Sequence, residues 1–161
     1  MSLFQALIPP KDLCRLKKAA EGKEVWAVPY DYEGACAEAE DVCLGVPYFN
    51  WGPAYLNAVK AVMDGKFTPT WEFLGPDWTN INNKDTSMIG FQKGKALSAE
   101  ASANLDKFIA ELAGGLNLWT GPINLQNGAE FLKAGEVGTD LQVWYLPELL
   151  EGMEGQSVPS N

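Results

Sequence analysis

An alternation of short apolar runs with helical segments constrains the fold most. Residues 24–28 and 42–46 are short, apolar and partly β-branched, which is typical of strands buried in a parallel sheet. Residues 52–65 begin with Gly-Pro, end at a glycine and carry apolar residues at helical spacing, so we expect a helix there. An earlier helix is expected over residues 11–22. This order of elements predicts an α/β fold built around a parallel sheet.

The second half of the chain is expected to contain one long helix and several shorter elements. Ser98 is a suitable N-cap for a helix over residues 99–113, and the apolar stripe of this helix is expected to pack in the core. Gly114 and Gly115 end it. The shorter elements are strands at 67–74, 86–91 and 116–120, loops at 75–85 and 121–138, and a helical or mixed segment at 140–150 that Pro147 breaks.

Length and charge limit the class of protein. With 161 residues, of which 47% are hydrophobic, the chain fits one domain with a substantial core. It carries 21 acidic and 12 basic residues, and a net charge of -9 repels phosphate backbones, so no nucleic-acid partner is expected. No apolar run approaches the roughly 18 residues of a spanning helix, and the N-terminus lacks the apolar region of a signal peptide.

The chain contains no histidine, which excludes Ser-His-Asp and Cys-His catalysis and every zinc site that needs histidine. No paired catalytic carboxylates are evident, and the lysines beside Gly94 do not form a phosphate-binding P-loop. We therefore expect neither enzyme activity nor a cofactor. The acidic residues Glu33, Glu38, Glu40 and Asp41 lack the spacing of a calcium loop, so we interpret them as a solvated surface and expect no metal ion.

The cysteines leave one question open. Cys14, Cys36 and Cys43 are too few for a disulfide framework. Cys36 and Cys43 are close enough in sequence to be bridged if their strands face each other. Free buried thiols are an equally good interpretation.

A long motif near the middle of the chain resembles one protein family. Residues 48–55 read Tyr-Phe-Asn-Trp-Gly-Pro-Ala-Tyr, and residues 59–65 read Val-Lys-Ala-Val-Met-Asp-Gly. Both are similar to a block of the basic-membrane-protein family, the substrate-binding lipoproteins of ABC importers. The order and spacing of three later elements also agree with that family: Trp-Thr-Gly-Pro-Ile at 119–123, Thr-Asp at 139–140 and Glu-Gly-Met-Glu-Gly at 151–155.

The resemblance covers residues 24–155 and implies the fold of a type I periplasmic binding protein, in which two α/β lobes enclose a cleft. The chain matches only about half of that fold, mainly the second lobe. Residues 1–23 match poorly, and residues 156–161 are expected to form a tail. The resemblance also implies an extracytoplasmic location, either periplasmic or as a membrane-anchored lipoprotein. An ABC permease would be the partner of the full-length receptor.

Ligands of layered α/β proteins bind beyond the carboxyl ends of the strands. In this chain those ends are the turns at residues 29–32 and 48–51. The resemblance adds a ligand class, because known members of the family bind purine nucleosides or related bases. The candidate ligand-binding residues are Tyr30, Asp31, Tyr48, Phe49 and Trp51.

The side chains of these candidates suit a purine ligand. Asp31, which matches an aspartate of the family, suits ribose hydroxyls, and the aromatic candidates suit a flat base. Two structural alternatives remain: Asp31 as a cap of the next turn and Trp51 as packing at the helix entry. The chain departs from the family at Pro29, which replaces an aspartate, and at Phe49, where some nucleoside-binding relatives carry a lysine. A bare base or another ligand with an apolar face is therefore expected alongside a nucleoside.

Two functional hypotheses follow. The first is a solute-binding component of an ABC importer, which binds a purine nucleoside, a nucleobase or a similar small molecule between two lobes without turnover. The alternative is a stand-alone module of one lobe, structural or enzymatic, that forms a homodimer and has lost the transport role. Ligand affinity without turnover distinguishes the first hypothesis, and a symmetric dimer distinguishes the second.

Overall fold

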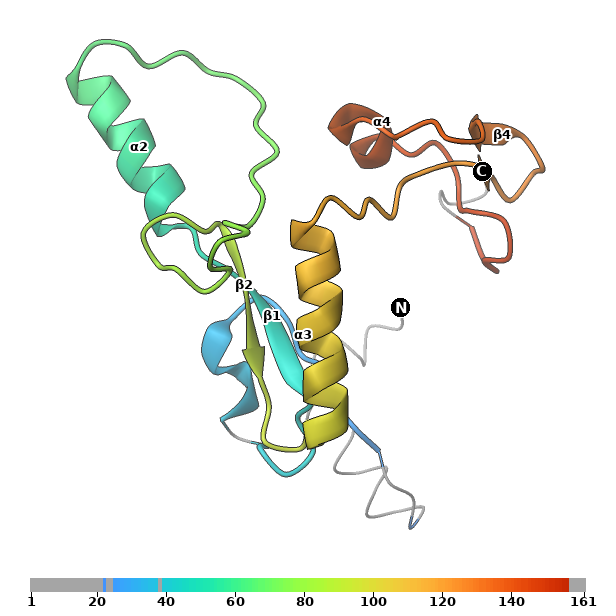
Figure 1. Ribbon diagram of the computed structural model, residues 1–161. Helices are drawn as coiled ribbons and strands as arrows, with labels where there is room; N and C mark the ends of the chain where they lie inside the picture. The colour runs from blue at the N-terminus through green and yellow to red at the C-terminus, as the bar shows by residue number, and fades with distance from the viewer. Residues whose placement is uncertain (1–21, 23–24, 38, 157–161) are drawn as a thin grey trace. The chain divides into compact units, whose positions relative to one another are not determined.

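The computed structural model describes residue 22, residues 25–37 and residues 39–156 (Figure 1). The chain divides into two compact units, Met1–Ala110 and Glu111–Asn161. The helix expected over residues 11–22, except its last residue, lies outside the described residues. The elements are the 3-10 helix η2 (Glu33–Cys36), β1 (Gly45–Phe49), α2 (Gly52–Met63), β2 (Ile89–Lys93), α3 (Ala99–Ala113), β3 (Ile123–Asn124), β4 (Glu130–Leu132) and α4 (Asp140–Trp144).

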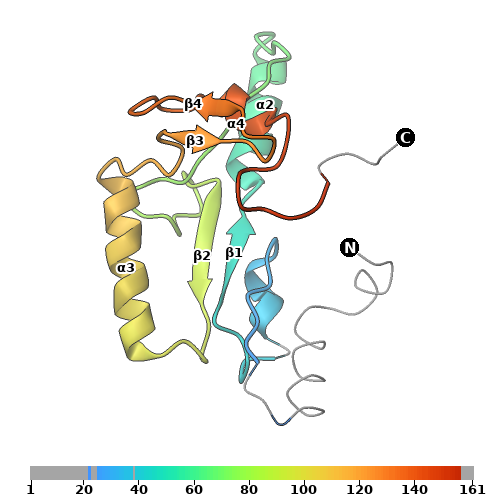
Figure 2. The ribbon, with the colours of Figure 1, turned by 90° about the vertical axis from the view of Figure 1, so that its right-hand side faces the viewer.

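The first unit is an α/β arrangement around β1. β1 and β2 pair antiparallel, with Gly45 opposite Lys93 (Figure 2). On the other edge of β1, single parallel bridges join Ala27 to Cys43 and Asp31 to Tyr48. The two apolar runs expected to be buried parallel strands therefore do lie side by side. Residues 25–28 contribute only the isolated bridge at Ala27 and form no strand in the described part of the chain, and β1 begins three residues later than residue 42. The strand expected at 86–91 forms as β2, but it runs antiparallel to β1.

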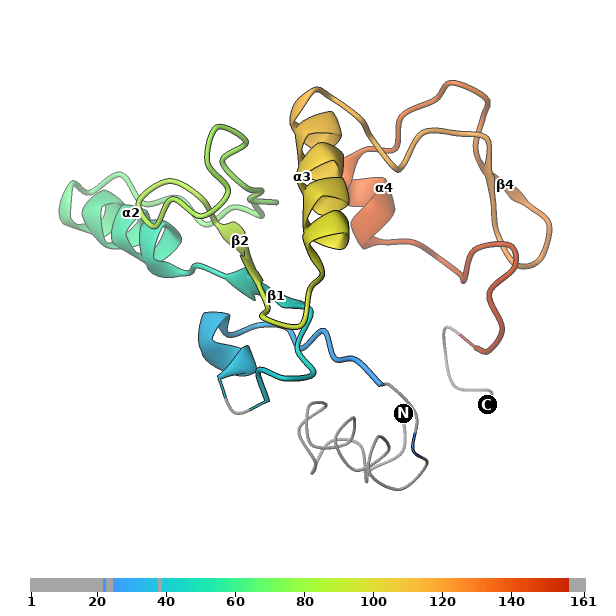
Figure 3. The same cartoon turned by 60° about the horizontal axis from the view of Figure 1, so that its bottom comes forward.

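The core of the first unit is small and lies around β1 and the loop before it. Val42 and Val46 are fully buried, and Ala27 is 3% exposed. A disulfide joins Cys36 to Cys43 with their Cα atoms 5.6 Å apart, which answers the open question of their pairing. Figure 3 shows η2 and α3 on opposite sides of the β1–β2 pair.

The helices α2 and α3 form where the sequence predicts them, but they are less buried than expected. α2 has proline in its first turn and ends before Gly65, whose φ of +65° suits glycine. In α3 no residue is fully buried, and Phe108 of the apolar stripe is 43% exposed. The prediction that the apolar stripe of α3 packs in the core is therefore wrong. The stripe has too few neighbouring elements in the described part of the chain to cover it.

Two other expected strands also do not form. Residues 67–74 are not assigned as a strand in the described part of the chain, and Pro69 within them has no N–H to donate to a ladder. Among the described residues, 116–120 contribute only one bridge, from Thr120 to Val137. Asn117 is the physical reason, because its side chain accepts a hydrogen bond from the N–H of Trp119 at 2.8 Å and so favours a turn.

The second unit is held together by a short hairpin and one capped helix. β3 and β4 pair antiparallel within the region expected to be a turn-rich loop. Thr139 caps α4 in a capping box with Gln142, as the Thr-Asp helix start predicts, and α4 ends before Pro147. Among the described residues, no helix is long and apolar enough to cross a membrane.

Candidate functional site

The end of β1 carries a row of aromatic rings. Phe49 is the last residue of β1, and Trp51 and Tyr55 follow at the start of α2. The Phe49 and Trp51 ring centroids are 5.3 Å apart. Trp51 and Tyr55, four residues apart and so neighbours on the helix surface, stack at 6.3 Å with only 20° between their planes. The strand exit and the first turn of α2 thus present these rings together.

A cavity of about 240 Å³ opens beside these rings, and we call it the aromatic cleft. Its other wall comes from the segment after α2, where Phe73 stacks on Trp71 at 5.8 Å. Its lining residues are Phe49, Asn50, Trp51, Ala54, Glu72, Phe73, Leu74, Gly75, Met88 and Ile89. Most of this surface is apolar or aromatic, which suits a flat, weakly polar ligand.

Hydrogen bonds hold the base of the aromatic cleft together. The amide nitrogen of the Asn50 side chain donates to the carbonyl oxygens of Lys84 and Ser87, both at 2.8 Å. The Asn50 backbone N–H donates to the carbonyl of Met88, and the Met88 N–H donates in turn to Gly75. Asn50 therefore connects the end of β1 to both the loop before β2 and the far wall of the cleft.

Asp31 lies next to Phe49, and neither Asp31 nor Tyr30 lines the aromatic cleft. The Phe49 N–H donates to the Asp31 carbonyl at 3.1 Å, and the Asp31 N–H donates to the Pro47 carbonyl at 3.0 Å. Asp31 has a φ of +86° and is the one non-glycine residue with positive φ in the described part of the chain. Such a backbone conformation is costly and is often found at functional sites. Tyr30 is 71% exposed.

Tyr48 takes a different place from the other candidates. It is only 4% exposed, and its hydroxyl donates to the Asn82 side-chain oxygen at 3.0 Å. The Lys84 ammonium lies 4.6 Å from the centre of its ring. Lys84 also pairs with Glu33, and the hydrogen bond between them raises the pKa of Lys84. The Tyr48 ring is therefore enclosed by protein groups and does not line the cleft.

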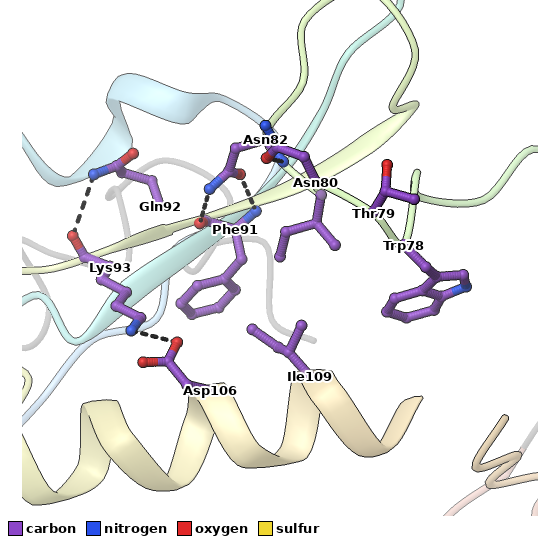
Figure 4. A pocket seen from close by; sticks show the side chains of 10 residues that line it. Trp78, Thr79, Asn80, Asn82, Phe91, Gln92, Lys93, Asp106 and Ile109 are labelled. Carbon is purple, nitrogen blue, oxygen red and sulfur yellow. Dashed lines mark hydrogen bonds and ion pairs between the residues drawn. The ribbon is translucent and has the colours of Figure 1, made fainter. Parts of the chain in front are cut away.

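A second pocket lies between the loop before β2 and α3 (Figure 4). It is larger, about 430 Å³, and Phe91 and Ile109 face each other across it. Its charged groups are already paired, since Lys93 lies 2.6 Å from Asp106. Asn82 exchanges two hydrogen bonds with the backbone of Phe91, so its side chain closes part of the outer edge of β2. Because these polar groups are already bonded to other protein groups, we favour the aromatic cleft as the site.

The acidic residues Glu33, Glu40 and Asp41 do not assemble a metal site among the described residues, and Glu38 lies outside those residues. Glu33 pairs with Lys84, and Glu40 pairs with Lys95. Sequence reasoning missed Glu72, Phe73 and Asn82. Asn82 lies in a stretch rich in Asn and Asp, which signals turns in general but gives no hint of its partners.

No protein-family model matches the chain. It is 35% identical over 106 residues to a purine-binding protein of Brucella abortus (strain 2308). The matched region covers 63% of this chain and 27% of the relative, so the chain spans about a quarter of the length of the curated relative it matches. The chain is thus similar, at a distance, to a purine-binding protein.

Proposed function

We propose that this chain is part of a receptor for small-molecule purines and that the aromatic cleft is its binding site. The observation that carries the proposal is the apolar cleft at the exit of β1, lined by Phe49 and Trp51, in a chain that is 35% identical to a purine-binding protein over 106 residues. A purine presents a flat π-face on each side. Stacking of a base on an aromatic side chain contributes about 1–3 kcal/mol.

The wider role we propose is that of the solute-binding component of an ABC importer. In this role the chain supplies one lobe, a second lobe closes over the ligand, and a permease receives it. The ligand is bound and released unchanged, because the cleft holds no pair of groups suited to acid–base chemistry. An extracytoplasmic location, periplasmic or as a membrane-anchored lipoprotein, accords with the Cys36–Cys43 disulfide, since disulfides persist in oxidising compartments.

The proposal is tested by titration calorimetry of the purified chain against a panel of purine bases and nucleosides. We expect at least one purine to bind and Trp51→Ala to weaken it about tenfold or more, the effect of losing roughly 1.4 kcal/mol. Tyr145→Ala, at an exposed ring in the second unit, is the matched control and should leave affinity unchanged. If no purine in the panel binds the parent chain, the proposal is wrong.

One observation favours the alternative of a dimeric single-lobe module. The apolar residues of α2 are largely exposed, including Leu56 at 53%, Val59 at 55% and Val62 at 61%. A second copy would bury such a surface. Sedimentation analysis tests this alternative, which predicts a dimer that Val59→Glu dissociates.

A further inference from the structure

Beside the indole N–H of Trp51, the polar side chains that line the aromatic cleft are Asn50 and Glu72, and these two can only accept hydrogen bonds. Both N–H groups of the Asn50 amide are already donated, to Lys84 and to Ser87, so only its oxygen is open to a ligand. Glu72 is exposed at the rim of the cleft. Within the described part of the chain, its carboxylate has no hydrogen bond and no ion pair. The cleft therefore offers an amide oxygen and a free carboxylate to whatever binds there.

The charge of the cleft also restricts its ligand. None of its ten lining residues is lysine or arginine, and Glu72 is the one ionisable side chain among them. A phosphate group would thus meet a carboxylate with no nearby cation in the lining, and like charges at short range repel. Nucleotides are therefore poor ligands for this site.

A bare purine and a nucleoside differ in the group that Glu72 would recognise. The imidazole ring of a bare purine carries an N–H, which is a hydrogen-bond donor. In a nucleoside the N9 nitrogen carries the sugar, so this donor is lost. Hydrogen bonds to an ionised carboxylate are the stronger kind, and a site built around one rejects an analogue that lacks the donor.

We infer that the aromatic cleft selects a bare purine base and that Glu72 is the specificity-determining residue, accepting the imidazole N–H of the base. This inference rests on the purine-binding function proposed above. The size of the cleft agrees with it, because about 240 Å³ is below the roughly 300 Å³ at which drug-sized ligand sites begin. Phe49 and Trp51 then contact the faces of the base, while Glu72 accepts a hydrogen bond from the imidazole N–H at its edge.

The test is calorimetry of the full chain with adenine and hypoxanthine, each compared with its 9-methyl derivative and its nucleoside. We expect each bare base to bind about tenfold or more tightly than its 9-methyl derivative. Glu72→Gln should weaken binding of the base and bring the ratio of the two affinities close to one. Glu111→Gln, an exposed glutamate outside the cleft, is the matched control and should keep the full ratio.

The outcomes separate this inference from the proposed function. Equal or tighter binding of the 9-methyl derivatives or nucleosides would overturn the selectivity while leaving purine binding intact. A ratio that survives Glu72→Gln would overturn the role of Glu72. Failure of every purine to bind would overturn the proposed function itself, and the inference with it. Thermal melting of both variants confirms that they remain folded.

Discussion

The N–H of Phe49 donates a 3.1 Å hydrogen bond to the carbonyl oxygen of Asp31. This bond joins the ends of two strand segments that lie 18 residues apart in the sequence, and it places the backbone of Asp31 directly beside the aromatic row of β1. The positive φ of Asp31 allows the chain to turn away at once into η2. Asp31 thus combines an exposed carboxylate with a backbone conformation that most residues avoid.

The conformation of Asp31 leads to a stability prediction. At a φ of +86° an alanine is strained, whereas glycine adopts this region without steric cost. We expect Asp31→Ala to be less stable than Asp31→Gly by about 1 kcal/mol. Urea denaturation of the two variants measures the difference. If alanine proves as stable as glycine, the residue does not hold this conformation in solution.

Asn82 is expected to contribute more to stability than its exposed loop suggests. Its side chain accepts hydrogen bonds from the Tyr48 hydroxyl and the Phe91 N–H, and donates one to the Phe91 carbonyl. Asn82→Ala leaves these groups without partners, so the free energy of unfolding should fall by about 1–3 kcal/mol. Asn104→Ala, on the exposed surface of α3, is the control and should change it little. Equal denaturation midpoints for the two variants would contradict this role.

The disulfide between Cys36 and Cys43 closes a short loop, with a sequence separation of 7 residues. Linking so short a loop restricts the unfolded chain and is expected to stabilise the fold by about 2 kcal/mol. A reductant should therefore lower the urea midpoint of the parent chain and have no effect on a Cys36→Ser, Cys43→Ser double variant. Cys14→Ser is the matched control and should keep the response to reductant. No shift in the parent chain would mean that the bond does not form or does not stabilise.

The sequence predicts where the site lies better than it predicts which residues line the site. Apolar runs and the Gly-Pro helix start locate the ends of two neighbouring strands, because these signals are local. Strand alternation then separates Tyr48 from Phe49: the first points into the core, and the second lies at the cleft. Glu72 and Phe73 were not predicted, because the segment that carries them reaches the cleft through a non-local contact between Gly75 and Met88.

How far the helices are buried also could not be predicted from local sequence patterns. The stripes of α2 and α3 have the spacing of buried helix faces, and that spacing correctly predicts the helices. Whether such a face is covered depends on elements that are distant in sequence. In the described part of the chain, the most extensive contacts between elements are those of β1 with β2 and with η2, and neither involves α2 or α3, so the two helices remain partly exposed.

Asp77 gives the loop before β2 a predictable response to acid. Hydrogen bonds from the side chains of Thr79 and Thr86, followed by the Thr79 N–H, lower the pKa of Asp77 from 3.8 to about 2. Because the folded pKa lies below the unfolded one, the stabilisation is fully present above about pH 4 and is lost as the pH falls towards 2. Urea midpoints of the parent chain should therefore fall over this window. Asp77→Asn should show a shallower decline between pH 4 and 2, because it has no proton to take up at this position, and an equally steep decline would show that other carboxylates account for the acid sensitivity.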